Sequence, residues 1–490
     1  MKGIKFDFNN LFSFNVSAQH GVTAFDFDKI KPLAKNALIH LETILENNKN
    51  RINLGLEWAN LPFQDMETVF KIKSLARDIL SKFENVLFLG IGGSYLGLKA
   101  AQDALCSPYY NEFANVRMGG PKVYFEGNNL DPETLNVLFK NLNPRKTFVI
   151  VISKSGETTE TKASFIIVEN WLKKNIGESY GRQIVAITDP FSGALREKVT
   201  AEQAKDKLSF RNLPLLKGVG GRYSELNMGL LHLAISGINI DEVLSGAKAM
   251  AKKCLARDIN KNPALLYAAL GIILYLKKKK SISILMPFSE GLKSSADWYC
   301  QLLAESTGKK YKRLVNISEE GLETWYQDKK RIFNAGRTPI AARGTNDLHS
   351  IQQNNIEGEN NKMVTFIRVE SFKNDIRMPG GKDMLSGRVY SELLSLAEEA
   401  TEWALVKENR PNCTIIMPEV NAHNWGELIY FFEMATAFEG ELLDINAFDQ
   451  PGVEGYKNYM YYKLRKPGLS KDIEKEIRLR PLVKKRKLII

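Results

Sequence analysis

One stretch of the 490-residue chain decides the fold: Thr147-Phe148-Val149-Ile150-Val151-Ile152-Ser153-Lys154-Ser155-Gly156-Glu157-Thr158-Thr159. Residues 147–152 form a short, almost wholly apolar run, which predicts a strand buried on both faces. The polar residues that follow interrupt the strand, and a helix is expected from about Thr161 to Lys173. A further strand is predicted from Ile184 to Thr188. Strands and helices that alternate in this way indicate an α/β fold with a doubly wound parallel sheet.

The segment between the first strand and its helix is rich in hydroxyl groups. Backbone N–H groups at a helix N-terminus can bind a phosphate monoester together with Ser and Thr hydroxyls, without a P-loop. Capping of the helix alone needs only one or two such side chains. The segment and the first helical turn contain more than that: Ser153, Ser155, Thr158, Thr159 and Thr161. We therefore expect the residues from Ser153 to Thr158 to bind a phosphate group.

A similar strand–turn–helix unit precedes this one. The apolar residues 86–89 run into Gly90-Ile91-Gly92-Gly93-Ser94-Tyr95-Leu96-Gly97, and a helix is expected from Leu98 to Leu105. A dinucleotide-binding fingerprint would need glycine in place of Tyr95, and the acidic residue Glu126 lies too far along the chain. The Gly-Lys-Ser/Thr of a P-loop is missing as well. Ser94 suits a sugar hydroxyl, while close packing of strand and helix explains the glycines nearly as well.

Farther along, Gly218-Val219-Gly220-Gly221-Arg222-Tyr223-Ser224 has three glycines before an arginine. The glycines let the backbone approach a neighbour closely, and the planar guanidinium of Arg222 suits a phosphate or a developing enolate oxygen. A surface carboxylate would be an equally good partner for Arg222 taken alone. From Met228 to about Leu276 the pattern is helical, and an apolar strand from Ser281 to Met286 starts a second sheet.

Glu305 is a candidate catalytic base. A helix expected from about Ser294 to Ser306 carries Asp297, Gln301 and Glu305 on one stripe, and such a stripe is ordinarily solvent-facing. Glu305 stands out because the helix ends directly after it, where a side chain can face a cleft.

His349 is a second candidate for acid–base chemistry. It is one of five histidines and lies in the polar loop 343–350, although a lone histidine is more often structural. No second histidine and carboxylate occur at metal-ligand spacing, so no metal site is expected.

The stretch Asp449-Gln450-Pro451-Gly452-Val453-Glu454-Gly455-Tyr456-Lys457 combines an acid, an amide, a Pro-Gly turn and a lysine. The turn ends the apolar helix before it, and a new helix can begin near Val453. Lys457 then lies in the first turn of that helix, where the helix dipole disfavours a cation. The lysine is therefore either solvated or kept for an anionic partner, and taken alone the stretch reads better as an ordinary turn.

The composition, 44% hydrophobic and 25% charged residues, is that of a soluble globular protein, and the length predicts two or three domains. No basic segment leads into an apolar stretch at the start, so no secretory signal is expected. The apolar run from Ala264 to Leu276 is too short to span a bilayer. Four scattered cysteines fit a reducing cytosol and argue against a disulfide framework and a zinc site.

The net charge of +12 raises the question of nucleic-acid binding. From Lys463 to Ile490, eleven basic residues against three acidic ones leave +8, so most of the excess lies in a C-terminal tail. Such a tail is most often solvated, and weak contact with RNA or an acidic surface is the minority interpretation. Outside the tail, basic residues do not alternate with aromatic ones along a face, so no nucleic-acid partner is expected.

In their order along the chain, these stretches resemble the glucose-6-phosphate isomerase (phosphoglucose isomerase) family from about residue 85 to 460. The resemblance rests on Gly90–Gly97, Ser153–Thr158, Val219–Ser224, Leu302–Gly308, Gly344–Ser350 and Asp449–Lys457. The arginine and lysine motifs are long and specific. The glycine turn is shared with other sugar-isomerase domains and is less specific.

The resemblance implies an α/β protein with two sugar-isomerase (SIS) domains, each a parallel sheet flanked by helices. The expected boundaries are an N-terminal helical segment 1–82, a first SIS domain 83–227, a helical bridge 228–280, a second SIS domain 281–448 and a C-terminal helical segment with the basic tail, 449–490. It also implies a cytoplasmic homodimer that needs no cofactor or metal.

The resemblance further implies reversible isomerisation of glucose 6-phosphate and fructose 6-phosphate through ring opening and a cis-enediolate. Glu305 is then the base that moves a proton between C2 and C1, and Arg222 stabilises the enediolate. His349 opens the ring with the help of Lys457 and reaches the site from the partner subunit. The other substrate contacts fall to Gly93, Ser94, Ser153, Lys154, Ser155, Gly156, Glu157, Thr158, Gln301 and Gln450.

Three features depart from the commonest family pattern. Ser155-Gly156-Glu157 replaces the Thr-Phe-Thr of animal-type members and resembles bacterial ones, a charged segment is inserted between Thr307 and Gly344, and the basic tail is unusual. One alternative function is a related isomerase that also acts on mannose 6-phosphate. Another is a sugar-phosphate-sensing protein, which would keep the phosphate loop but lack a base.

Overall fold

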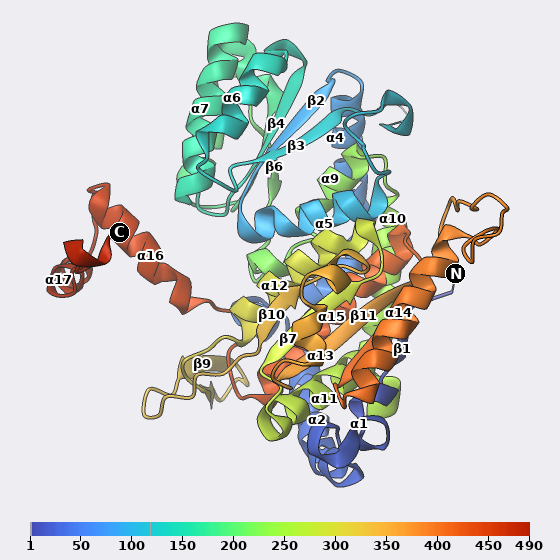
Figure 1. Cartoon of the computed structure of the whole chain (residues 1–490). Coiled ribbons are helices and arrows are strands. Elements are labelled where there is room, and N and C mark those ends of the chain that lie inside the picture. The colour runs from blue at the N-terminus through green and yellow to red at the C-terminus, as the bar shows by residue number, and fades with distance from the viewer. Residues whose placement is uncertain (1, 118) are drawn as a thin grey trace. The chain divides into compact units, whose positions relative to one another are not determined.

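The computed structural model describes residues 2–117 and 119–490. It divides into two compact units, Met1–Phe448 and Asp449–Ile490, and each is described by itself. The first unit contains two five-stranded sheets and a two-stranded hairpin (Figure 1). Within the described residues, none of the helices combines the length and apolar character that a membrane span requires.

All strands of the first sheet run parallel, in the order β3-β2-β4-β5-β6. Their bounds are β2 Asn85–Leu89, β3 Lys122–Glu126, β4 Thr147–Ile152, β5 Ile184–Thr188 and β6 Arg211–Pro214. The central strands β2, β4 and β5 are buried along their whole length, as their apolar runs predict. The edge strand β6 is only partly buried and has no apolar run, so the sequence does not predict it.

Helices cover both faces of this sheet (Figure 1). One face packs against α6 (Pro132–Asn141), α7 (Thr159–Ile176) and α8 (Ala194–Lys205), and the other against α4 (Met66–Leu80) and α5 (Leu96–Leu105). The neighbouring strands β2 and β4 are therefore followed by helices on opposite faces, which makes the gap between them a topological switch point. Open α/β sheets bind ligands outside the carboxyl ends of their strands at such a point. The two turns that the sequence singled out leave the sheet there.

The ends of α7 follow from local sequence. Thr158 is the N-cap residue, with extended backbone, and Glu160 lies in the first turn. Lys173 and Lys174 lie in the last turn, so charges at both ends complement the helix dipole. Gly177 ends the helix at φ 78°, a conformation that glycine adopts without strain.

The second sheet has the order β1-β12-β11-β7-β10. Its strands are β7 Ile282–Pro287, β10 Thr338–Ala341, β11 Lys362–Ser371, β12 Asn412–Glu419 and β1 Lys5–Asp7. The parallel strands β10-β7-β11-β12 repeat the β3-β2-β4-β5 arrangement of the first sheet. The two parallel sheets with flanking helices confirm the predicted α/β class.

The edge strand β1 comes from the N-terminal segment and pairs antiparallel with β12, with Lys5 opposite Ile416. The rest of that segment is mainly helical, as the sequence predicts: α1 Ser13–His20, α2 Ala24–Glu46 and α3 Asn48–Asn53 precede α4. The three residues of β1 are too few for a periodic pattern, so the sequence does not predict this strand.

The remaining helices of the first unit are α9 Gly229–Ile235, α10 Ile240–Cys254, α11 Pro263–Lys278, α12 Lys293–Thr307, α13 Gln352–Ile356, α14 Tyr390–Lys407 and α15 Ala422–Leu442. Helix α15 is buried nearly throughout and packs against α10, α11 and α12. Because α12 contacts both α5 and the second sheet, it lies where a side chain can reach both halves of the unit.

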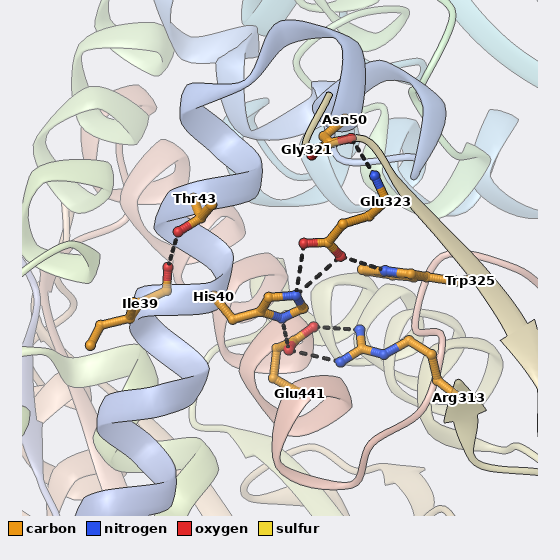
Figure 2. A network of polar contacts seen from close by, with 9 residues as sticks. All are labelled: Ile39, His40, Thr43, Asn50, Arg313, Gly321, Glu323, Trp325 and Glu441. Atoms are coloured by element: carbon orange, nitrogen blue, oxygen red, sulfur yellow. Dashed lines mark hydrogen bonds and ion pairs between the residues drawn. The ribbon is translucent and has the colours of Figure 1, made fainter. Parts of the chain in front are cut away.

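The charged insertion forms a hairpin, β8 (Arg313–Ile317) and β9 (Glu323–Gln327), between α12 and β10. Figure 2 shows the network that fastens it to α2 and α15. His40 on α2 lies between two carboxylates, with Nδ1 2.6 Å from Glu441 Oε2 and Nε2 3.1 Å from Glu323 Oε2. Arg313 donates to both oxygens of Glu441, at 2.6 and 2.9 Å.

The second unit contains α16 (Glu454–Lys463) and α17 (Lys471–Leu479). The Ser470 hydroxyl caps α17, accepting a hydrogen bond from the backbone N–H of Asp472 at 3.3 Å. The residues after α17 are exposed. The domain boundaries given above stay predictions.

Candidate active site

The Arg222 guanidinium is fixed by contacts with distant parts of the chain. Arg222 lies in the short 3-10 helix Gly221–Tyr223 and is only 2% exposed. Its Nε donates to Ser306 Oγ at 2.7 Å, and its Nη2 donates to the carbonyl oxygen of Ala447 at 2.6 Å. Its Nη1 lies 3.3 Å from Glu305 Oε2. The cation therefore has an ordered position beside the candidate base.

Glu305 lies in the last turn of α12, and its side chain is 29% exposed. Gln301, one turn earlier, donates from Nε2 to Glu305 Oε1 at 3.1 Å. Both carboxylate oxygens are thus held, one by Gln301 and one by Arg222, while part of the group is open to solvent. A base needs this combination, because its lone pair must reach a substrate in a defined direction.

The Ser306 hydroxyl links Arg222 to Tyr223. Its oxygen accepts from Arg222 and lies 2.9 Å from the hydroxyl of Tyr223. Tyr223 is buried and stacks on Trp58 at 4.9 Å between ring centroids. Burial raises the pKa of Tyr223 to about 12, so the phenol is neutral and can share its proton with Ser306.

The two glycine-rich turns touch each other. A Cβ on Gly93 would lie 2.1 Å from the carbonyl carbon and oxygen of Gly221, so only glycine fits there. A Cβ on Gly92 would lie 2.9 Å from Gln301 Nε2. These glycines therefore pack against a second turn and against α12, and this packing brings the turn that carries Ser94 next to Arg222 and Gln301.

The candidate phosphate loop, residues 153–158, follows β4, and two of its serine side chains hydrogen-bond to the backbone of the loop itself. Ser153 Oγ accepts from the backbone N–H of Gly156 at 3.0 Å, and Ser155 Oγ accepts from that of Glu157 at 3.1 Å. Each hydroxyl keeps its own hydrogen for another acceptor. The Thr158 side chain makes no capping bond to α7. The loop thus presents hydroxyl donors at a helix N-terminus.

Lys154 and Glu157 differ in their surroundings. Lys154 is exposed, whereas Glu157 Oε1 pairs with Lys162 Nζ at 2.7 Å.

Leu89 of β2 is in register with Val151 of β4, so the glycine turn and the phosphate loop leave adjacent strands at the same sheet edge.

His349 lies outside this cluster of contacts. It ends a short 3-10 helix, Asn346–His349, after β10, and its side chain is exposed. The loop is held by Asp347, which accepts from the backbone N–H of Arg343 at 2.7 Å and from the Ser350 hydroxyl at 2.7 Å.

Gln450 and Lys457 belong to the second unit. Lys457 lies in the first turn of α16, with Nζ 2.8 Å from Glu454 Oε1. Within residues 2–117 and 119–490, no group of three or more His, Cys, Asp or Glu side chains is arranged to hold a metal ion.

The sequence prediction therefore named Arg222, Glu305, Gln301 and the two turns, which the fold brings near one another. It missed Ser306 and the carbonyl of Ala447, which hold Arg222. Ser306 follows Glu305 and lies on the buried side of α12. Its position in the helical pattern could have been used to predict this. The carbonyl of Ala447 has no such signal, because any residue supplies a carbonyl.

The fold and site define an α/β protein in which a partly exposed carboxylate and a buried cation lie near a switch point with a hydroxyl-rich loop. Comparison with known proteins shows which family of this class the chain belongs to. The family model described as phosphoglucose isomerase matches residues 70–466. The glucose-6-phosphate isomerase of Carboxydothermus hydrogenoformans is 39% identical over 484 residues, 97% of this chain and 98% of that protein. That of Listeria monocytogenes serovar 1/2a is 34% identical over 98% of this chain and its own full length.

Solved structures agree in fold. A hypothetical protein from Thermus thermophilus aligns with a TM-score of 0.77 at 30% identity, covering 94% of this chain and 99% of its own. A glucose-6-phosphate isomerase from Chlamydia trachomatis aligns with a TM-score of 0.68 at 24% identity, covering 86% and 81%. The chain belongs to the phosphoglucose isomerase family.

Proposed function

We propose that this chain catalyses the reversible isomerisation of glucose 6-phosphate and fructose 6-phosphate. Membership of the phosphoglucose isomerase family and the names of its full-length relatives support this reaction. The observation that carries it in the structure is the contact between Arg222 and Glu305, with the carboxylate partly open to solvent. Neither a sensing role nor an additional mannose 6-phosphate activity is favoured by any feature of the site.

The chemistry asks for one base and one cation. The Glu305 carboxylate removes the proton from C2 of the open-chain aldose, and the bonding electrons form the C1=C2 bond of a cis-enediolate. Negative charge develops on O1, where a preorganised guanidinium such as that of Arg222 stabilises it. The hydroxyl proton on O2 passes to O1, and Glu305 returns its proton to C1. The product is the ketose, and the base is regenerated.

The other roles are proposals of the same kind. The loop 153–158 binds the phosphate with its hydroxyls and backbone N–H groups, since a helix N-terminus favours an anion. Gly93, Ser94, Gln301 and Gln450 contact the sugar. His349 opens the ring with the help of Lys457, and the chain acts without a cofactor.

The exposed position of His349 supports a further proposal, that two chains form a dimer in the cytoplasm and His349 enters the partner's site. A histidine that is exposed on one chain can contribute to the active site of a second chain that packs against it.

The experiment that tests the function is isomerisation of fructose 6-phosphate, followed as glucose 6-phosphate through a coupled dehydrogenase. Glu305→Gln keeps the shape and the hydrogen bond from Gln301 but loses the base, so kcat should fall by about 10²-fold or more. Glu399→Gln on the exposed surface of α14 is the matched control and should keep full activity. Substrate binding without turnover in the wild-type protein would instead support a sensor.

A further inference from the structure

Four basic side chains gather at the amino edge of the second sheet, whereas the candidate active site lies at carboxyl strand ends. Lys280 lies just before β7, Lys362 is the first residue of β11, Arg410 lies two residues before β12, and His20 ends α1. We call these four residues the basic cluster.

Strand pairing brings two members together. Val364 of β11 and Asn412 of β12 are partners in parallel register. Lys362 and Arg410 lie two residues earlier on each chain segment, so they occupy neighbouring positions on the same face of the sheet. Lys362 is 8% exposed.

Lys280 is joined to the same edge by hydrogen bonds. Its side chain is 0% exposed, and Nζ donates to Asn360 Oδ1 at 2.7 Å, to the Asn360 carbonyl at 2.5 Å and to His20 Nδ1 at 3.2 Å. Asn360 in turn donates from Nδ2 to the carbonyl of Asn409 at 3.0 Å, next to Arg410. These bonds use all three ammonium hydrogens of Lys280, and each acceptor is neutral.

The basic cluster has no counter-charge in direct contact. Among the described residues, no carboxylate lies within ion-pair distance of Lys280, Lys362 or Arg410. Their neighbour Lys278 does have one, because its Nζ lies 3.1 Å from Asp26 Oδ2. Buried cations without a paired anion are rare because desolvation is costly.

Mutual repulsion adds to burial in lowering the pKa of the members of the basic cluster. Burial, followed by the charges of Arg410 and Lys362, lowers the pKa of Lys280 to about 8. Burial and the charges of Lys280 and Arg410 lower the pKa of His20. Burial and the charge of Arg410 likewise lower the pKa of Lys362, which the charge of Glu359 only partly offsets.

Unused hydrogen-bond donors accompany this excess of positive charge. Nε and Nη1 of Arg410 are both buried and have no acceptor. Lys362 Nζ donates to the Glu359 carbonyl at 2.9 Å and to Asn361 Oδ1 at 3.2 Å, so one of its three hydrogens is unused. A water molecule could accept these bonds but would not balance the charge.

We propose that the basic cluster binds a small tetrahedral oxyanion of the sulfate or phosphate type, in a site separate from the phosphate loop. The oxygens of one ion can accept from the unused donors of two side chains, Arg410 and Lys362, and the ion supplies the missing negative charge beside Lys280. The unused donors are buried atoms of Arg410, which is a partly exposed residue, and of the buried Lys362, and this favours a small ion over a nucleic acid or a membrane surface. The bound ion stabilises the amino edge of the second sheet.

The test measures apparent melting temperature against sodium sulfate, with sodium chloride at equal ionic strength as the reference. The wild type should gain stability with a saturable dependence and half-effect near millimolar sulfate, a rise of about 1–2 °C at saturation. Arg410→Gln should show a smaller saturable rise, because it loses the contribution of the basic cluster and keeps any contribution from the phosphate loop. Arg257→Gln is the matched control, since the Arg257 side chain is 83% exposed and its contact with Glu42 is 3.6 Å long. General salting effects of sulfate are common to all three proteins and cancel.

The proposal predicts that sulfate reverses the order of stability of the wild type and Arg410→Gln. Without sulfate, Arg410→Gln should be at least as stable as the wild type, because it removes a partly buried charge that has no ion-pair partner, and with sulfate it should be less stable. Equal sulfate responses in all three proteins would overturn the proposal, as would an equal effect of chloride. So would a loss of stability in Arg410→Gln that is the same at every sulfate concentration.

A measurement on the wild type alone covers the case in which the variant does not fold. Sulfate should slow hydrogen–deuterium exchange at residues 359–364 and 408–413, and separately at 153–158 if the phosphate loop also binds it. Slowing at the loop without slowing at the two strand starts would contradict the second site and leave the proposed catalytic function untouched.

Discussion

At the scale of single residues, the site depends on how Arg222 is held. Three acceptors from two distant parts of the chain surround one planar guanidinium: Glu305 Oε2 and Ser306 Oγ at the end of α12, and the Ala447 carbonyl. A lysine ammonium is a point charge on a flexible stem and cannot keep that arrangement.

We therefore expect Arg222→Lys to lower kcat/KM for fructose 6-phosphate by about 10²-fold or more, although the charge is conserved. Arg257→Lys at the exposed site serves as the control and should leave kinetics unchanged. Steady-state kinetics of both variants decide the matter, and near-normal activity of Arg222→Lys would show that charge alone is sufficient.

At this scale the sequence singles out side chains by their chemistry, and the roles assigned to them stay predictions. Glu305, Arg222 and the hydroxyls of the phosphate loop have side chains whose chemistry is evident in their motifs. Ser306 and the Ala447 carbonyl gain their role only because segments 84 and 225 residues from Arg222 pack against it. Such contacts depend on tertiary packing, which no local pattern encodes.

At the scale of elements, α7 allows a comparison of two glycines with nearly equal φ angles. Gly156 has φ 76° before the helix, and a Cβ there would lie 2.5 Å from the backbone nitrogen of Leu195. Gly177 has φ 78° after the helix, and a Cβ there would meet nothing within 4 Å.

Gly156→Ala should therefore displace the phosphate loop and raise KM about 10-fold or more, with a smaller change in kcat, because phosphate contacts act on ground state and transition state alike. Gly177→Ala should cost about 1–3 kcal/mol of stability, because its φ of 78° and ψ of −151° suit essentially only glycine, and should leave KM unchanged. If both variants changed KM equally, the loop would not be the phosphate site.

The hairpin β8–β9 is an element whose attachment should depend on pH. The hydrogen bond with Glu441 raises the pKa of His40, burial opposes it, and the charges of Glu441 and Glu323 add to the rise against that of Arg313. A raised pKa means that this stabilisation is complete below pH 6.5 and is lost as pH rises through the higher folded value.

Between pH 6 and 8.5, the melting temperature of the wild type should thus fall more than that of His40→Gln, which cannot titrate. Glu323→Gln removes one of the two carboxylates and should show an intermediate slope. Melting curves across this range give the comparison, and parallel slopes in wild type and His40→Gln would exclude the effect.

At the scale of the whole molecule, the proposed exchange of His349 between subunits has a sharp test. Glu305→Gln and His349→Ala chains, each inactive alone, are mixed so that hybrid dimers form. If His349 crosses, one site of each hybrid is intact, and random mixing should restore about a quarter of wild-type activity. If both residues serve the same chain's site, mixing should restore none.

The whole-molecule architecture could be predicted only in part. The strands β2, β4, β5 and β7 are visible in the sequence because burial on both faces forces continuous apolar runs. The edge strands β1 and β6 have one unpaired side and carry polar residues, so they resemble loops. The strand order, which is the same in the two sheets, depends on which strands pair with one another, and no local sequence pattern indicates it.

The position of β1 has a consequence for the way the chain is made. Residues 85–214 supply every strand of the first sheet, so a ribosome that has released them has released a complete sheet. The second sheet is different, because Lys5 pairs with Ile416 and the backbone N–H of Ile4 donates to Glu427 at 2.8 Å. During translation β1 therefore cannot pair until β12, the last of the described strands, has emerged, and its edge stays unpaired until then.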